Sequence, residues 1–392
     1  MNNFKLDFQD TATAFADKSD DELKEKYRLF QMMNSPVLTS IGTKATELAL
    51  ALGLPVKGLI KKTLYKQFCG GETIEECEPT IEKLGESNIG TILDYSVEGK
   101  SEEADFGKTK DEIKRTIERA RVDERIPFAV FKVTGIAPLG TLEKISSGIE
   151  LTEKGKWKWE RIRSRVEDIC KFAHSLGQPV FIDGEDSWIQ NGIDLLATEM
   201  MGKFNAEKPI IYDTVQLYRH DRLEFLKKSH DKARLDGYIL AVKLVRGAYL
   251  EKERNRAEEM NYPSPIQPTK EATDRDFDAA VEYCLDNIET IAFVAGTHND
   301  KSTELMVRKM EEKGIAHNHR HVYFSQLYGM SDNLSYVLAK NNYNVSKYVP
   351  YGPVKDAVPY LIRRAQENSS VMGQMSRELD LIGKELKRRK SS

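Results

Sequence analysis

The sequence predicts an α/β fold in the form of a (β/α)8, TIM-like barrel preceded by a helical region. From about residue 89, short runs rich in β-branched and aromatic residues alternate with amphipathic helical stretches. This repeat indicates parallel strands joined by crossover helices, and eight units over about 280 residues fit a barrel. A doubly wound open sheet is the alternative, but no Gly-x-Gly-x-x-Gly follows the first run, which argues against a dinucleotide domain. The eight runs are residues 89–96, 127–135, 179–186, 209–218, 238–249, 290–299, 321–330 and 347–352.

The sequence divides into three parts. Residues 1–87 have a helical pattern, in which Ser19 is an N-cap followed by acidic residues. A second helical stretch, residues 43–68, is interrupted by Gly53 and Pro55. Residues 88–370 form the predicted barrel, and residues 371–392 form a basic C-terminal tail.

The tail has an apolar stripe beside its basic end. Leu379, Ile382 and Leu386 are spaced for one helix face. We interpret the tail as a solvated or partly packed terminal helix. The alternative is weak attraction to an anionic membrane surface, which favours basic residues beside an apolar face.

The composition is that of a globular protein with balanced charge. The chain has 392 residues, 59 Lys and Arg against 62 Asp and Glu, and 40% hydrophobic residues. This balance gives no reason to expect a nucleic-acid partner. We find no apolar run of membrane-spanning length, and the acidic N-terminus does not resemble a secretory signal or transit peptide. The four scattered cysteines suggest reduced, mostly buried thiols, so we expect a cytoplasmic location, with the tail as a candidate contact to the inner face of the membrane.

Polar and aromatic residues follow the predicted strands, at the barrel end where active sites lie. Capping the strands would need only Gly, Asn, Ser and Asp, so converging lysines and arginines predict at least one anionic ligand. Gly247-Ala248 would let the backbone approach a phosphate or a flat ring closely. The residues at these ends are Asp94, Tyr95, Lys132, Asp183, Glu185, Asp186, Gln216, Tyr218, Arg219, Lys243, Arg246, Tyr249, Thr297, His298, Asn299, Gln326, Leu327, Tyr328, Tyr348 and Tyr351.

Two clusters resemble metal sites, and we expect neither to bind a metal. His317, His319 and His321 precede the seventh strand, at the end of a barrel that serves stability, and no carboxylate is interleaved with them. The acidic group that begins at Asp183 and ends at Asp186 has nearby lysines and arginines that would compete for its carboxylates.

The stretch "YLIRRAQENSS", residues 360–370, reads as a helix that carries two adjacent arginines. Neighbouring residues on a helix point about 100° apart, so Arg363 and Arg364 do not share a face. One reading is a solvated face with a local ion pair to Glu367. The other is a clamp on a carboxylate, because the planar guanidinium matches a carboxylate in two-point contact.

The chain resembles the proline dehydrogenases, the FAD-dependent enzymes of proline catabolism, in their monofunctional form. The matching stretches occur in the order of that family and cover roughly residues 88–370, with the combination of "KLVRGAY" and "YLIRRAQEN" the most specific. The others are "LDYSVEG", "FKVTG", "FIDGEDSW", "VQLYRHDR", "GTHN", "QLYGM" and "YVPYG".

The resemblance implies a role for particular residues. Arg363 and Arg364 would clamp the proline carboxylate from an eighth helix lying over the pocket mouth, with Lys132 adding positive charge. Asp183 would orient this clamp through an ion pair. The residues implied to form an apolar wall around the pyrrolidine ring are Tyr249, Leu327 and Tyr348. The residues implied to hold FAD are Gln216, Lys243, Arg246, Gly247, Ala248, Thr297, His298 and Glu367, with Lys243 nearest the flavin N5 edge and Glu367 pairing either with the cationic cluster or with the cofactor.

The implied reaction is oxidation of L-proline to Δ1-pyrroline-5-carboxylate by hydride transfer to flavin N5, as the first step of proline catabolism. A quinone would accept the electrons, and a separate pyrroline-5-carboxylate dehydrogenase would use the product. One alternative is a hydroxyproline dehydrogenase on the same scaffold. The other is a non-catalytic ligand-binding barrel.

Overall fold

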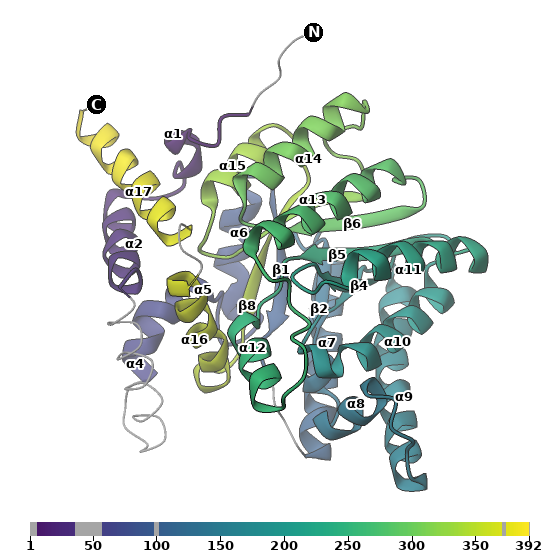
Figure 1. The fold of residues 1–392 in the computed structure, drawn as a ribbon. Helices are drawn as coiled ribbons and strands as arrows, with labels where there is room; N and C mark the ends of the chain where they lie inside the picture. The colour runs from purple at the N-terminus through teal and green to yellow at the C-terminus, as the bar shows by residue number, and fades with distance from the viewer. Residues whose placement is uncertain (1–5, 36–56, 98–101, 371–373, 392) are drawn as a thin grey trace.

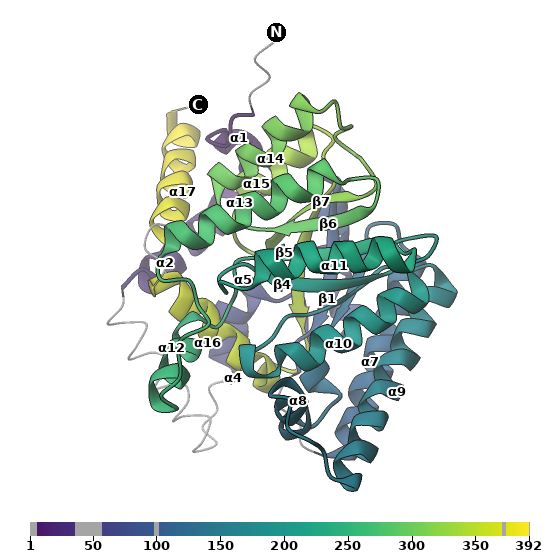
Figure 2. The same cartoon turned by 45° about the vertical axis from the view of Figure 1, so that its right-hand side comes forward.

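Short, apolar, β-rich runs pair in parallel and close into an eight-stranded barrel (Figures 1 and 2). The computed structural model describes residues 6–35, 57–97, 102–370 and 374–391, and side chains are not described for residues 57, 59, 365–370 and 374. The strand order follows the chain order, and β1 closes the barrel against β8. The predicted barrel is therefore confirmed. The strands are β1 (Ile89–Tyr95), β2 (Phe128–Phe131), β3 (Val180–Ile182), β4 (Ile211–Gln216), β5 (Leu240–Val245), β6 (Ile291–Gly296), β7 (Val322–Leu327) and β8 (Val345–Tyr351).

A helix follows each strand and packs outside the sheet, except the last. Two additional helices, α8 (Leu139–Ser146) and α12 (Leu250–Glu259), lengthen the connections after β2 and β5. The helices that follow the strands are α7 (Glu103–Arg121), α9 (Glu153–Leu176), α10 (Ser187–Phe204), α11 (Arg222–Asp236), α13 (Lys270–Asp286), α14 (Asp300–Glu312), α15 (Asp332–Lys340) and α16 (Val354–Ser370).

The interior of the barrel is filled by large side chains from alternating strand positions. Phe128 and Phe181 stack with ring centroids 4.5 Å apart, and Tyr212 meets both rings edge-on. These rings belong to a small buried cluster with Ile92 and Val130. Because aromatic side chains plug this layer, the open space of the barrel is left at the carboxyl ends of the strands.

Helices from both ends of the chain share a second hydrophobic cluster beside the barrel. The N-terminal elements are α1 (Thr11–Ala14), α2 (Asp20–Met33), α4 (Lys57–Ile60), a π-helical turn (Lys61–Tyr65) and α5 (Lys66–Phe68), and the C-terminal one is α17 (Gln374–Ser391). The helix α6 (Glu78–Gly85) packs instead in the main core through Ile81 and Leu84. Both views show α2 and α17 side by side (Figures 1 and 2). Phe15, Leu23 and Phe30 pack in one cluster with Leu381 and Ile382. The predicted break at Gly53 and Pro55 lies outside the described residues.

The packing of α17 corrects one reading of the C-terminal tail. Its apolar face is buried in this cluster, with Leu379 and Leu386 packed against it, so the face is not available to lie on a membrane. At its basic end, Arg388 and Arg389 both donate to the buried Glu385. The structure therefore favours a packed terminal helix. None of the described helices is long and apolar enough to cross a bilayer.

The two candidate metal clusters have other partners in the structure. The His317 ring stacks on Tyr343, with centroids 4.2 Å apart, and His321 Nδ1 lies 2.8 Å from the carbonyl of Ile288. Glu185 accepts from the Thr134 backbone, and Asp186 pairs with Lys252. All four cysteines are buried free thiols, as expected.

Candidate active site

The carboxyl ends of the strands surround a cavity of about 760 Å³. This volume is in the upper part of the usual range for small-molecule sites, about 300 to 1,000 Å³, and exceeds what one amino acid needs. Cationic side chains on the wall outnumber carboxylates. The cations are Lys132, Lys243, Arg246, Lys270, Lys301, Arg363, Arg364 and Arg377, and the carboxylates are Asp94, Asp183, Glu271, Asp274 and Asp300.

The cavity brings together the predicted site residues, apart from Glu367. Glu367 lies on α16, but its side chain is outside what the structure describes. The individual roles of these residues stay predictions. The predicted residues on the wall are Lys132, Asp183, Gln216, Lys243, Arg246, Gly247, Ala248, Tyr249, Thr297, His298, Leu327, Tyr348, Arg363 and Arg364.

Asp183 is the centre of a buried polar cluster on the cavity wall. It follows β3 directly, accepts from Lys243 Nζ, and takes a 2.6 Å hydrogen bond from the Tyr348 hydroxyl. Lys132 Nζ lies 3.7 Å away. Burial on its own would raise the pKa of Asp183, but the two lysines together with these hydrogen bonds hold it below its ordinary value. The carboxylate is therefore charged, whereas burial and Asp183 raise the pKa of Tyr348 and keep its hydroxyl protonated.

Lys132 has a second carboxylate partner, Asp94, which the sequence placed at a strand end without giving it a role. Its Nζ donates to both carboxylate oxygens of Asp94, each at 2.8 Å. Asp94 lies near the end of β1, next to β2, and its register partner there is Val130. Because β1 and β2 are adjacent and parallel, they carry Asp94 and Lys132 to the same rim of the barrel. The position of both residues at strand ends was therefore the sequence signal for their contact.

Arg246 is held in place by several contacts. Its guanidinium donates to Asp274 Oδ1 at 2.6 Å, Thr297 Oγ1 at 2.7 Å and Ser302 Oγ at 2.9 Å. It also lies over the Phe277 ring, 4.4 Å from the centroid. This charge is therefore fixed at the wall before any ligand arrives, which lowers the ordering cost of binding.

Gly247 brings the backbone close to a neighbouring ring. Its φ of +141° is rare for residues with a side chain, and a Cβ there would come within 2.4 Å of Tyr218. Glycine is therefore required both by the conformation and by the space.

His298 is half-buried and neutral. Its Nδ1 lies 2.9 Å from Ser331 Oγ, and its Nε2 accepts from the Leu327 N–H at 3.4 Å. An N–H can only donate, so the imidazole proton belongs on Nδ1. Burial, reinforced by Lys347 and nearby arginines, lowers the pKa of His298 well below its ordinary value. The ring therefore offers a polar, uncharged wall.

The adjacent arginines lie over the cavity on α16. Arg364 is buried and lies over the Tyr360 ring at 5.4 Å, whereas Arg363 lies over the Tyr249 ring at 5.5 Å. Both line the cavity, which favours the clamp reading over a solvated face. The partners of Asp183 described above are lysines and a tyrosine, and its ion pair with the arginines stays a prediction.

Sequence reasoning missed several contributors to the wall, and two of them lie beyond the strand ends. Tyr360 precedes the arginines on α16, and Arg377 comes from α17, beyond the predicted barrel. Nothing in the sequence distinguishes Arg377 from the other basic residues of the tail, because its place depends on how α17 docks.

Comparisons with known proteins agree on one family. The family described as Proline dehydrogenase matches residues 77–377. A carbapenem biosynthesis protein, CarD, from Pectobacterium carotovorum is 35% identical over 82% of this chain and 83% of its own length. Proline dehydrogenase 1 of Dictyostelium discoideum is 31% identical over 99% of this chain and 76% of its length. The human proline dehydrogenase 1 is 39% identical over 79% of this chain, which spans 48% of that protein.

Solved structures share the fold. Proline utilization A from Bdellovibrio bacteriovorus, inactivated by N-propargylglycine, superposes with a TM-score of 0.71 at 19% identity. The match covers 93% of this chain but 38% of that larger protein.

Proposed function

Because this chain belongs to the proline dehydrogenase family and is therefore an oxidoreductase of proline catabolism, we propose that it oxidises L-proline to Δ1-pyrroline-5-carboxylate with FAD. The observation that carries the proposal is the cavity in which Arg363 and Arg364 face the same space as the cluster of Lys132, Asp183 and Tyr348. A fixed cationic group for a carboxylate and a polar cluster for the ring end are what an amino-acid substrate needs.

Two features of the cavity support a flavin dinucleotide as cofactor beside the amino acid, namely its size and its lining. Its volume of about 760 Å³ exceeds the need of proline alone. Gly247 permits close approach to the backbone, and Arg246 presents an immobilised positive charge. The residues assigned to hold FAD are Gln216, Lys243, Arg246, Gly247, Ala248, Thr297 and His298, with Glu367 as predicted from the resemblance.

The chain's own residues position proline and control its charge. FAD, when bound, supplies the hydride acceptor at N5. Arg363 and Arg364 bind the carboxylate in two-point contact and so orient the ring. The reacting amine has to be unprotonated, and the lysines of the cluster disfavour an ammonium beside them. Asp183 lies between Lys132 and Lys243 and keeps both in place. Most of the rate enhancement then comes from positioning, without a dedicated base.

Tyr348 favours proline over its hydroxylated analogue. Its hydroxyl is already bonded to Asp183, and its ring lies 5.1 Å from Lys243 Nζ and 5.9 Å from Lys132 Nζ. A substrate hydroxyl directed here would have to displace these contacts. We expect kcat/KM for L-proline to exceed that for trans-4-hydroxy-L-proline, and comparison of the two substrates tests this.

The reduced cofactor has to be reoxidised, and we assign this step to a quinone, as the family resemblance implies. A soluble short-chain quinone should support steady-state turnover with proline. Turnover that is supported only by a different acceptor would exclude this assignment.

The first test is the visible spectrum of the purified protein before and after anaerobic addition of L-proline. Flavin bands that bleach on addition would support both cofactor and substrate. Bands that proline leaves unchanged in folded protein would keep the cofactor and exclude the substrate. A folded, colourless protein that takes up no added FAD would overturn the proposal.

A further inference from the structure

Arg377 brings the C-terminal helix into the wall of the cavity. It lies in the first turns of α17, outside the barrel repeat, yet it lines the same space as the strand ends. Its Nη1 is 2.9 Å from Asp300 Oδ1. Its Nη2 donates to the carbonyl of His298 at 3.1 Å and to Ser331 Oγ at 3.4 Å. One guanidinium therefore joins the loop after β6, the start of α14 and the loop after β7.

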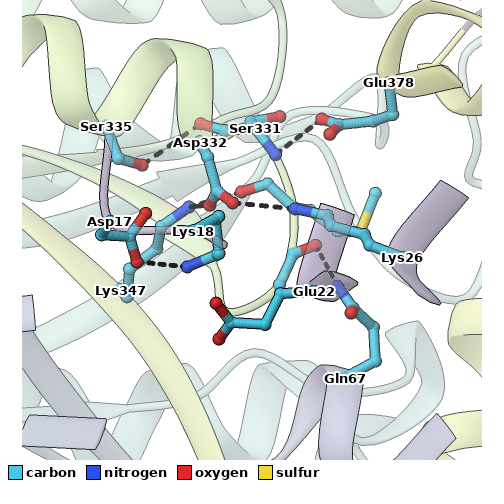
Figure 3. A network of polar contacts seen from close by, with 12 residues as sticks. Asp17, Lys18, Glu22, Lys26, Gln67, Ser331, Asp332, Ser335, Lys347 and Glu378 are labelled. Atoms are coloured by element: carbon cyan, nitrogen blue, oxygen red, sulfur yellow. Dashed lines mark hydrogen bonds and ion pairs between the residues drawn. The ribbon is translucent and has the colours of Figure 1, made fainter. Parts of the chain in front are cut away.

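The next residue, Glu378, holds the same loop from its other side. Its side chain is buried and accepts from the Ser331 N–H at 2.6 Å (Figure 3). Ser331 has a φ of +51°, a conformation that non-glycine residues adopt only when their surroundings enforce it. Its hydroxyl lies 2.9 Å from His298 Nδ1. Arg377 and Glu378 thus fix Ser331, which in turn orients the half-buried His298.

The position of α17 is set away from the cavity. Leu381 and Ile382 pack in the cluster with Phe15 and Leu23 of the N-terminal region. Further along, the buried Glu385 accepts from Thr11 at 2.9 Å. A helix anchored in this way carries Arg377 to a fixed place, so the guanidinium acts as a rigid bracket rather than a mobile surface charge.

We propose that Arg377 is a positioning residue of the FAD site, holding His298 and Ser331 in the arrangement that the cofactor needs. The inference rests on the proposed function and extends it to a helix outside the barrel. Without the Arg377 guanidinium, the loops after β6 and β7 would become ordered only when FAD binds. The entropic cost of ordering them would weaken the affinity for FAD. The clamp for the substrate carboxylate lies on α16, so proline binding should change little.

The test compares FAD affinity in full-length apoprotein variants, measured by quenching of flavin fluorescence. Arg377→Gln should raise the Kd for FAD about tenfold, because hydrogen bonds from a charged group are lost. Arg377→Lys keeps the positive charge beside Asp300 but loses the planar guanidinium that also reaches His298 and Ser331. Its Kd for FAD should therefore lie between those of the wild type and Arg377→Gln. At saturating FAD, the KM for proline should stay within about twofold of the wild-type value.

A matched control is Arg388→Gln, which removes an arginine of the same helix far from the cavity, where Arg389 still pairs with Glu385. Its Kd for FAD should equal that of the wild type. Asp300→Asn should weaken FAD binding as well, and its effect should be less than additive with Arg377→Gln, since the two share one contact.

Several outcomes would overturn the inference. Unchanged FAD affinity in Arg377→Gln would do so, while leaving the proposed function intact. If Arg377→Gln does not fold, unchanged FAD affinity in both Arg377→Lys and Asp300→Asn would also overturn the inference. A wild-type protein that binds no FAD would overturn the proposed cofactor and the inference together.

Discussion

Arg363 and Arg364 are the residues on which substrate binding should depend most. If they clamp the carboxylate of proline, Arg363→Ala or Arg364→Ala loses charged hydrogen bonds worth about 1.5–3 kcal/mol each. The KM for proline should rise roughly ten- to hundredfold. Steady-state kinetics measure this, and the flavin spectrum of each variant should show that FAD remains bound.

The opposite pattern would refute the assignment of the clamp. A variant that lost FAD while its KM for proline stayed unchanged would place that arginine on the cofactor instead. The distinction is possible because the two arginines come from α16, whereas Arg246 and Gly247 follow β5.

Gly247 should tolerate no side chain. Gly247→Ala places a Cβ within 2.4 Å of the Tyr218 ring and imposes a left-handed φ on alanine. We expect a loss of about 1–3 kcal/mol in the free energy of unfolding, accompanied by weaker FAD binding. Thermal unfolding and flavin titration measure the two effects.

A suitable control is Gly107→Ala, because Gly107 lies within α7 and a Cβ there meets nothing within 4 Å. This substitution should be neutral or stabilising, by up to about 1 kcal/mol. Equal destabilisation by both alanines would mean that the approach of Gly247 to Tyr218 is not the cause.

At the scale of single residues, the sequence was informative wherever a side chain stands at a strand end. Lys132, Asp183 and Tyr348 could be found because parallel strands deliver their carboxyl ends to one rim. Their mutual contacts could not, since they depend on strand register. Asp94 shows this, because its pairing with Lys132 follows from the alignment of β1 and β2.

At the scale of elements, a buried charge cluster ties α2 to the barrel. Lys26 on α2 and Lys347 on β8 both bind Asp332, at 2.8 and 2.9 Å, and all three residues are buried (Figure 3). Burial alone would raise the pKa of Asp332, but the lysines hold it well below its ordinary value. The carboxylate is therefore charged and neutralises cations from two elements.

Removing the charge of Asp332 should destabilise the protein severely. Asp332→Asn leaves two buried ammonium groups without their shared partner, which should cost about 3–5 kcal/mol. The control is Asp21→Asn, whose exposed partner Lys24 lies on the same helix, and which should cost less than about 1 kcal/mol. Urea unfolding measures both, and similar small losses would contradict the importance of the cluster.

The sequence pattern identified barrel strands better than added helices. Each strand was visible as a short run rich in β-branched and aromatic residues, as expected for parallel strands that are covered on both faces. The helices α8 and α12 were not singled out, as they are short insertions whose place is set by tertiary contacts. The role of α17 was invisible for a related reason, since its partners lie at the other end of the chain.

At the scale of the whole molecule, the neutral His298 makes stability depend on pH. Burial, with Lys347, Arg364, Arg377 and Arg246 around it, lowers the pKa of His298 in the folded state. In the unfolded chain the ring takes up a proton near pH 6.5, whereas in the fold it does not. The contribution of His298 to the free energy of unfolding is therefore fully present above pH 6.5 and declines as the pH falls below that value.

His298→Asn should reduce this pH dependence. Between pH 7 and pH 5.5, the wild-type protein should lose about 1.3 kcal/mol more unfolding free energy than the variant does. His230 and His319 also have lowered pKa values and titrate in both proteins, so the difference isolates His298. Urea unfolding of the apoproteins at the two pH values measures it, and parallel losses would show that His298 is protonated in the fold.

The cluster shared by α1, α2 and α17 also has a consequence for biosynthesis. Thr11 donates to Glu385, a residue 374 positions later. At about 5–20 residues per second, translation needs roughly twenty seconds to a minute to produce that partner. Until then, the apolar faces of α1 and α2 lack the helix that covers them. Synthesis of α17 therefore completes both the packing of these earlier helices and the wall of the cavity.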